Sequence, residues 1–214
     1  MELFDATTAG MVARKLLEIN AIKLQPKQPF TWASGWKSPI YCDNRLALSY
    51  PEVRSLIKHK LVEVAHKKFD RVEAVAGVAT AGIPQGALVA DALDLPFLYV
   101  RSKAKGHGME NMIEGKVTVG QRVLVVEDLV STGGSSLKAV QDLKTAGFDV
   151  VGMVAIFTYG FEVAKENFQH AGIKLVCLSD YEALLPEAIA ADYVTANDLE
   201  SLNTWRKDPG SWAV

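Results

Sequence analysis

The chain has 214 residues, with 23 lysines and arginines against 25 aspartates and glutamates, and a formal net charge of -2. This balance argues against a protein that binds nucleic acid through bulk positive charge. Hydrophobic residues make up 49% of the sequence and charged residues 22%, a composition that excludes disordered, collagen-like and low-complexity proteins. The length fits one large domain, or one domain with a small subdomain.

The sequence predicts neither a membrane-spanning segment nor a secretory signal. The longest stretch without a charged residue, residues 74–90, is interrupted by glycine, proline, threonine and glutamine, whereas a membrane helix needs ~20 mostly apolar residues. Charged residues are scattered through the first fifteen positions, where a signal peptide would carry an apolar core. The two cysteines, Cys42 and Cys177, have apolar neighbours that suit reduced, buried thiols. These features predict a cytoplasmic protein.

The first 70 residues differ in pattern from the rest. We predict an amphipathic helix over residues 6–19, then an irregular stretch rich in tryptophan and serine over residues 32–39. A second helix is expected further on, where four apolar residues recur at helical spacing. These are Val53, Ile57, Leu61 and Val64. Residues 1–70 are therefore expected to form an N-terminal helix and a hood, or lid, within the same domain as the core that follows.

From residue 71 to residue 214, short apolar runs alternate with amphipathic segments. The runs typical of strands buried on both faces are residues 74–77, 123–126, 150–157 and, as a shorter candidate, 173–178. Residues 86–93 and 135–146 are expected to be helices, the second ending at Gly147. Strand, helix and strand in this order predict an α/β fold with a mostly parallel sheet flanked by helices.

One segment of this core, residues 101–115, has neither helical nor strand periodicity. Its first half combines Arg101, Lys103, Lys105 and His107 with two glycines. Long segments of this kind in a compact domain are usually functional or disordered. We therefore predict a long mobile loop with a functional role.

The stretch from Arg122 to Ser136 carries the most chemical information. Four apolar residues are followed by two adjacent carboxylates, Glu127 and Asp128, and then by a turn of serine, threonine and glycine that opens a helix. Backbone N–H groups at such a helix start bind a phosphate dianion, assisted by the helix dipole. The same turn is also compatible with an ordinary helix N-cap.

The paired carboxylates favour the phosphate interpretation. Two acids beside an anion site repel the anion unless they bind something else, and ribose hydroxyls or the ligand shell of Mg2+ are the natural partners. A ribose 5-phosphate satisfies both halves of the motif, because its phosphate fits the turn and its hydroxyls fit the acids.

Three segments resemble motifs of a known family. Residues 123–135 resemble the phosphoribosyl pyrophosphate motif of the type I phosphoribosyltransferases, in which four apolar residues and two acids precede a phosphate loop. Residues 30–45 resemble the N-terminal signature of the orotate phosphoribosyltransferases, and residues 101–108 resemble their catalytic loop. The motifs occur in the family order, and the resemblance covers essentially the whole chain. A Walker P-loop is not found.

The resemblance implies the type I phosphoribosyltransferase fold and a reaction. The 5-phosphoribosyl group of 5-phosphoribosyl 1-pyrophosphate (PRPP) would pass to orotate, giving orotidine 5'-monophosphate and pyrophosphate in de novo pyrimidine biosynthesis. It also implies Mg2+ carried by PRPP, without a separate protein metal site, and a homodimer whose active-site loop reaches the neighbouring subunit.

Residue roles follow from the same resemblance. Catalysis is expected from Arg101, Lys105, His107 and Asp128, and a contact to orotate from Ser131. Contacts to PRPP are implied for Arg101, Lys105, His107, Glu127, Asp128, Leu129, Val130, Ser131, Thr132, Gly133, Gly134 and Ser135.

Further contacts are expected outside these motifs. Residues 77–84 correspond to a turn that meets pyrophosphate through backbone groups in this family, although a plain strand-to-helix connection is the alternative. An arginine often found in the family after the 150–157 strand, facing the orotate carboxylate, has no counterpart in residues 158–161. Lys37, Tyr41 and Arg45 are therefore candidates for supplying charge or stacking.

Two other functions stay open at this point. A phosphoribosyltransferase for a purine base would carry a similar phosphoribosyl motif, but the segment 30–45 argues against it. A non-catalytic regulator that binds PRPP and a nucleic acid would need a basic face or an added DNA-binding module, and the net charge of -2 suggests neither. We therefore expect no nucleic-acid partner and no membrane partner.

Overall fold

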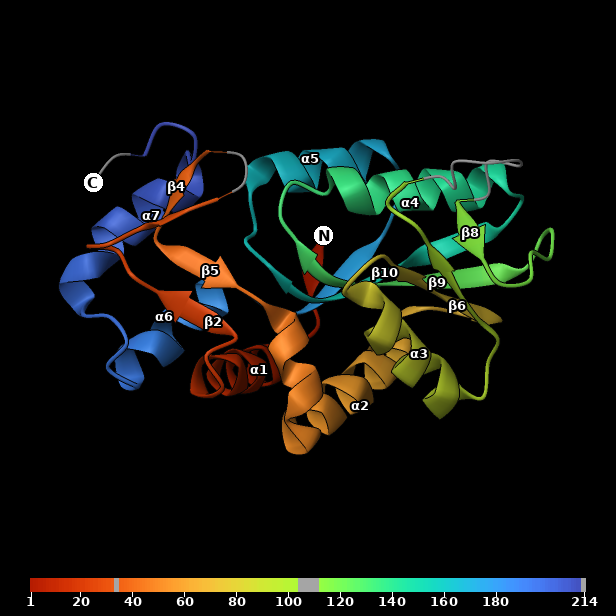
Figure 1. The fold of residues 1–214 in the computed structure, drawn as a ribbon, viewed down its shortest axis with the longest axis horizontal. Coiled ribbons are helices and arrows are strands. Elements are labelled where there is room, and N and C mark those ends of the chain that lie inside the picture. The colour runs from red at the N-terminus through yellow and green to blue at the C-terminus, as the bar shows by residue number, and fades with distance from the viewer. Residues whose placement is uncertain (33–34, 104–111, 213–214) are drawn as a thin grey trace.

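A seven-stranded sheet forms the centre of the molecule in the computed structural model, which describes residues 1–32, 35–103 and 112–212 (Figure 1). In spatial order the strands are β1 (Glu2–Leu3), β11 (Leu175–Asp180), β10 (Asp149–Thr158), β9 (Arg122–Val130), β6 (Ala74–Val78), β7 (Phe97–Val100) and β8 (Ile113–Glu114). Every neighbouring pair is parallel except β7 and β8. The predicted α/β fold with a mostly parallel sheet is confirmed.

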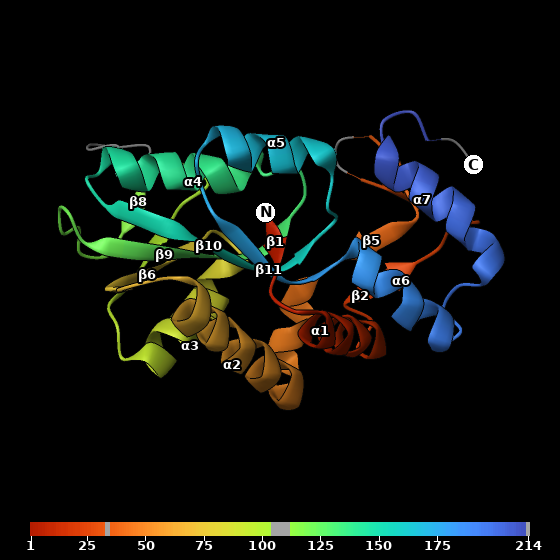
Figure 2. The same ribbon diagram turned by 180° about the vertical axis from the view of Figure 1, so that it is seen from behind.

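Helices cover both faces of this sheet, as the two opposite views show (Figures 1 and 2). One face carries α1 (Ala6–Glu18), α2 (Pro51–Lys68) and α3 (Gly82–Leu93), and the other carries α4 (Gly134–Thr145) and α5 (Glu162–His170). Each face has its own cluster of buried apolar side chains. In α2 the four apolar residues predicted to share one face are all buried in the first cluster.

Small elements lie beside one end of the sheet. They are the antiparallel pairs β2 (Ile22–Leu24) with β5 (Ile40–Cys42) and β3 (Phe30–Thr31) with β4 (Lys37–Ser38), the 3-10 turns Asn44–Ser49 and Ala196–Asp198, and the helices α6 (Tyr181–Ala190) and α7 (Leu199–Lys207). The fully buried Trp205 of α7 ties them together, because its indole N–H donates to the Lys37 carbonyl at 3.2 Å and its ring lies 5.7 Å from that of Trp32. The segment between α1 and α2 and the C-terminal helices therefore build this region jointly, while the N-terminus lies in the central sheet (Figure 1).

The first 70 residues divide between the two regions. Helices α1 and α2 pack on the sheet and belong to its larger apolar cluster, so they do not form a separate lid. The small strands between them lie with α6 and α7, and α1 also packs against α6, where Arg14 forms an ion pair with Glu187 at 2.8 Å. The boundary at residue 70 stays a prediction.

Some element boundaries differ from those predicted. Helix α3 begins at Gly82 rather than residue 86, which Pro84 permits because the N–H that proline lacks has no helical partner in a first turn. Strand β9 continues to Val130, since its pairing with β10 extends to Thr158. Within the predicted loop 101–115, Ile113 and Glu114 form β8 through pairing with β7.

Two predictions drawn from composition can be compared with the structure. Cys42 and Cys177 are free thiols, and Cys177 is buried, which confirms the prediction of unpaired cysteines. Within the part of the chain that the structure describes, no helix is both long enough and apolar enough to cross a membrane.

Candidate functional site

The two adjacent acids are the sixth and seventh of the nine residues of β9, toward the carboxyl edge of the sheet. Glu127 is opposite Ala155 of β10 in the parallel register. Its side chain is only 5% exposed, and its two carboxylate oxygens accept hydrogen bonds from the Ser136 hydroxyl at 2.9 Å and the Asp128 backbone N–H at 3.1 Å. Burial, together with the charge of Asp128, raises the pKa of Glu127 well above its usual range. Through the Ser136 hydroxyl, Glu127 is bonded to the first turn of α4.

Asp128 is less buried than Glu127 and is held from a different side. Its backbone carbonyl accepts a hydrogen bond from the Asn44 side-chain amide at 2.8 Å, and the Asn44 side-chain oxygen accepts from the Cys42 thiol at 3.4 Å. Burial raises the pKa of the Asp128 carboxyl. Asn44, which the sequence analysis gave no role, thus connects the end of β9 to the small strands.

Residues 131–133 form the loop from β9 to α4, called the β9–α4 loop below. Gly133 has a φ of 82°, and a Cβ at this position would lie 2.8 Å from a ring carbon of the buried Phe168, so only glycine fits without displacement. The Thr132 carbonyl accepts from the Asn167 side-chain amide of α5 at 3.0 Å. Helix α4 has no side-chain cap, and its first residues, Gly134 and Ser135, are exposed. Their backbone N–H groups are available to an anion.

The predicted site residues of this segment therefore come together around one loop. Leu129, Ser131 and Thr132 are half-buried, while Val130 and Gly133 are buried.

A cavity of about 300 Å3, called the aromatic cavity below, opens beside this loop. It is lined by Thr31, Trp32, Tyr41, Cys42, Leu129, Ser131 and Tyr159. Leu129 and Ser131 belong to the phosphoribosyl motif of residues 123–135. Tyr159 directly follows β10, whose carboxyl end lies next to that of β9. The cavity thus joins the small strands to the carboxyl edge of the sheet.

The predicted candidates for charge near this cavity differ in position. Tyr41 lines the cavity. Lys37 lies at its rim, because the Lys37 ammonium donates to the hydroxyl of the cavity residue Thr31 at 2.8 Å. Arg45 is instead paired with Asp43 at 2.6 Å, which raises the Arg45 pKa and lowers that of Asp43.

The turn after β6 meets the same edge of the sheet. A Cβ at Gly82 would lie 2.5 Å from the Val126 carbonyl oxygen, so glycine allows the start of α3 to touch the β9 backbone just before the two acids. The Ala79 backbone N–H donates to the Val100 carbonyl at the end of β7 at 2.9 Å. The predicted turn therefore lies close to the paired acids, as the parallel order of β6 and β9 requires.

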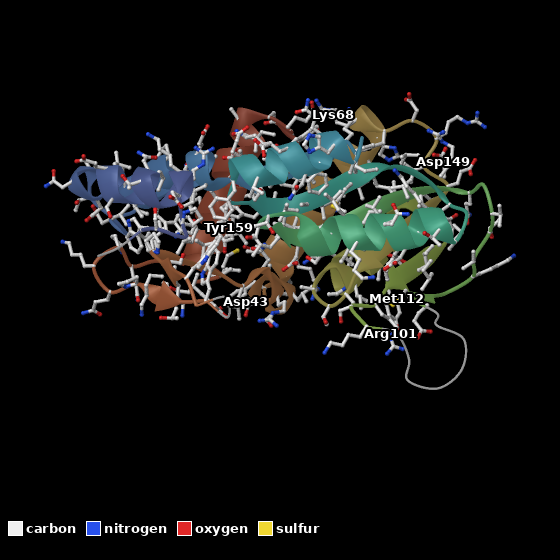
Figure 3. The ribbon with its side chains drawn as sticks, turned by 90° about the horizontal axis from the view of Figure 1, so that it is seen from above. Asp43, Lys68, Arg101, Met112, Asp149 and Tyr159 are labelled. Carbon is white, nitrogen blue, oxygen red and sulfur yellow. The ribbon has the colours of Figure 1, made fainter. Side chains whose placement is uncertain are left out.

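Arg101 follows β7, and its guanidinium forms an ion pair with Glu114 of β8 at 3.1 Å. Figure 3 shows Arg101 well away from Tyr159, and strands β9 and β6 lie between the strands that these two residues follow. Lys105 and His107, the other two predicted residues of the catalytic loop, lie outside the described residues. In the described part of the chain, no group of three or more histidine, cysteine, aspartate or glutamate side chains is arranged to hold a metal ion.

Comparison with known proteins gives consistent matches over nearly the full length. The model of the phosphoribosyl transferase domain matches residues 46–179. The orotate phosphoribosyltransferase of Cytophaga hutchinsonii is 58% identical over 201 residues, covering 94% of this chain and 96% of that protein.

Solved structures agree with the sequence matches. The crystal structure of orotate phosphoribosyltransferase from Aeropyrum pernix has a TM-score of 0.74 at 33% identity and covers 83% of this chain and 97% of that chain. The Mycobacterium tuberculosis orotate phosphoribosyltransferase in complex with PRPP has a TM-score of 0.64 at 26% identity and covers 82% of this chain and 97% of that chain.

Proposed function

Because the chain belongs to the orotate phosphoribosyltransferases, we propose that its β9–α4 loop binds PRPP and that its aromatic cavity receives orotate. The enzyme transfers the 5-phosphoribosyl group of PRPP to orotate, giving orotidine 5'-monophosphate and pyrophosphate in pyrimidine biosynthesis. One observation supports this placement most directly, since Leu129 and Ser131 belong both to the phosphate motif and to the cavity wall. A base in the cavity would lie next to a sugar on the loop.

The β9–α4 loop and the start of α4 are assigned to the 5-phosphate. The exposed N–H groups at Gly134 and Ser135 and the hydroxyls of Ser131 and Thr132 supply donors, and the helix dipole favours the dianion. The left-handed backbone at Gly133 turns the chain into the helix there. Leu129 and Val130 shape the approach to this loop as the last residues of β9.

Asp128 is assigned to the ribose. Departure of pyrophosphate leaves positive charge on the sugar ring, and a carboxylate held beside that ring stabilises it. Asp128 is the better placed of the two acids, because Glu127 is already bonded to Ser136 and would have to turn away from α4 to reach a ribose hydroxyl. Glu127 in its present position orients the start of α4.

Mg2+ is proposed to enter with PRPP. The ion prefers oxygen ligands and usually combines one or two carboxylates with substrate phosphates, and the half-buried Asp128 beside the anion loop fits that donor set. Bound there, Mg2+ would supply charge neutralisation of the phosphates. Asp128 is the residue that would share its shell, since Glu127 is bonded to Ser136 in this fold.

Arg101, Lys105 and His107 are assigned to the pyrophosphate, whose negative charge grows as it leaves. Arg101 would exchange its partner Glu114 for the phosphate oxygens. The wide separation of Arg101 from Tyr159 in one subunit supports a homodimer in which each loop serves the neighbouring site (Figure 3). Two free thiols suit a reducing compartment, so we place this enzyme in the cytoplasm.

Lys37 is proposed to draw the carboxylate of orotate to the mouth of the cavity. It lies at the rim through its bond to Thr31, while the walls of the cavity are mainly aromatic and aliphatic. A charged carboxylate is more stable at such a solvated rim than deep in an apolar cavity. The planar ring would then face inward, between the aromatic side chains.

The function is tested by following the loss of orotate absorbance in the presence of PRPP and Mg2+, with adenine, hypoxanthine, guanine and uracil in parallel. We expect turnover of orotate and no comparable turnover of the purines. Equal or faster reaction with a purine base would overturn the assignment.

A further inference from the structure

Tyr159 is a buried side chain whose polar group the fold leaves without a partner. The residue is only 3% exposed, yet its hydroxyl makes no hydrogen bond with any residue that the structure describes. Two other tyrosines donate hydrogen bonds from their hydroxyls to backbone carbonyls. Tyr181 donates to the Leu202 carbonyl at 3.2 Å, and Tyr193 donates to the Leu17 carbonyl at 3.0 Å. The Tyr159 hydroxyl is not one of the enclosed, unpaired side-chain atoms of the described residues, and Tyr159 lines the aromatic cavity, so a ligand in that cavity can accept its hydrogen bond.

The ring of Tyr159 is fixed from several sides. It lies 5.1 Å from the ring of Trp32, 5.8 Å edge-on from that of Trp205 and 5.5 Å from that of Phe161. Its backbone N–H donates to the Val130 carbonyl at 3.3 Å, which ties it to the end of β9. These contacts hold the ring in one position, so its hydroxyl is directed before a ligand arrives.

The unpartnered hydroxyl belongs to the wall of the aromatic cavity. Burial raises the pKa of Tyr159 above its ordinary value, and the neighbouring Asp128 acts in the same direction. The phenol therefore stays protonated and acts as a neutral hydrogen-bond donor at physiological pH. Ser131, which directly follows β9, contributes a further side-chain hydroxyl to this wall.

The cavity thus combines flat aromatic walls with directed donors. A planar heterocycle with carbonyl oxygens attached to its ring fits this arrangement, because its faces stack on the aromatic side chains and its oxygens accept from the hydroxyls. We propose that the Tyr159 hydroxyl donates a hydrogen bond to an oxygen of bound orotate and so determines specificity for this base. This inference rests on the proposed placement of orotate in the aromatic cavity.

The test is Tyr159→Phe, which deletes the hydroxyl and keeps the ring. A hydrogen bond made equally to bound substrate and to the transition state affects KM and leaves kcat unchanged. We expect the KM for orotate to rise roughly 3- to 30-fold, as one lost hydrogen bond implies. The KM for PRPP and the kcat should stay within about twofold of wild type on the same grounds.

Tyr181→Phe is the matched control. It deletes a buried phenol in contact with the same Trp205, but its hydroxyl bonds a carbonyl of α7 and does not line the aromatic cavity. We expect this variant to lower the melting temperature without changing the KM for orotate. Thermal unfolding of both variants shows whether a change in KM accompanies a loss of folding.

The outcomes separate this inference from the function itself. An orotate KM for Tyr159→Phe within twofold of wild type, in a folded enzyme that turns over orotate, refutes the role of the hydroxyl alone. The same refutation follows if KM rises equally in Tyr181→Phe. A wild-type enzyme that does not consume orotate would instead refute the function on which the inference rests.

Discussion

Gly133 offers the sharpest test of the β9–α4 loop. Its φ of 82° lies in the left-handed region, which costs an alanine about 1–2 kcal/mol. A Cβ would also lie 2.8 Å from a ring carbon of Phe168, which is fully buried, and overpacking of this kind costs about 1–3 kcal/mol. We expect Gly133→Ala to lower the free energy of unfolding by about 2–4 kcal/mol, allowing for partial relaxation. The KM for PRPP should rise as well, because the loop must shift.

Gly134→Ala is the neighbouring control. A Cβ there would meet nothing closer than the Thr132 hydroxyl at 4.0 Å, and the residue begins α4, where alanine is favourable. Its free energy of unfolding should stay within about 1 kcal/mol of wild type. Urea unfolding of the ligand-free proteins measures both changes. Equal destabilisation by the two alanines, or a loss below about 1 kcal/mol at Gly133, would refute the reasoning.

Three further predictions concern the acids and the loop. Asp128→Asn should lower kcat by about 10²–10³ with the fold intact by circular dichroism, and a near-normal kcat would contradict its role at the ribose. Burial raises the pKa of Glu127 in the folded protein, so the contribution of this carboxyl to stability is full below about pH 4 and is lost as the pH rises. Glu127→Gln removes the titrating group and should flatten the fall in unfolding free energy between pH 5 and pH 8. When the separate variants Lys105→Ala and Asp128→Asn are unfolded and refolded together, a homodimer with shared sites should regain about a quarter of wild-type activity. No recovery in confirmed heterodimers would show that each subunit uses its own loop.

Strands β6, β9, β10 and β11 and helices α1 to α4 were predicted, the strands from continuous apolar runs and the helices from amphipathic patterns, whereas β7 and α5 were not predicted. The central residues of β6, β9, β10 and β11 are apolar, as expected for strands between two helical layers, and the polar residues lie toward the strand ends. The short strands could not be predicted in the same way. Pairs such as β3 with β4 have two residues each, and they are held by contacts such as that from Trp205, some 170 positions away in the sequence.

The candidate site likewise has a part that was predictable from the sequence and a part that was not. The acids and the β9–α4 loop are contiguous in sequence, so their chemistry could be inferred from one segment. The aromatic cavity is built from four separate segments, at residues 31–32, 41–42, 129–131 and 159. The position of Tyr159 in the site could have been predicted from its place in the sequence. It directly follows a strand that is parallel and adjacent to β9, so it must lie at the same edge of the sheet.

Strand geometry also separates two acids that look equivalent in the sequence. Side chains alternate between the faces of a strand, and in β9 Val123 and Val125 join the cluster under α4 while Leu124 and Val126 join the opposite cluster. The alternation carries Glu127 to the α4 face, where it meets Ser136. We therefore propose that Glu127 serves the fold and that Asp128 serves the ligand. Glu127→Gln should therefore act mainly on the pH dependence of stability and Asp128→Asn mainly on kcat, and a reversed pattern would contradict this division of roles.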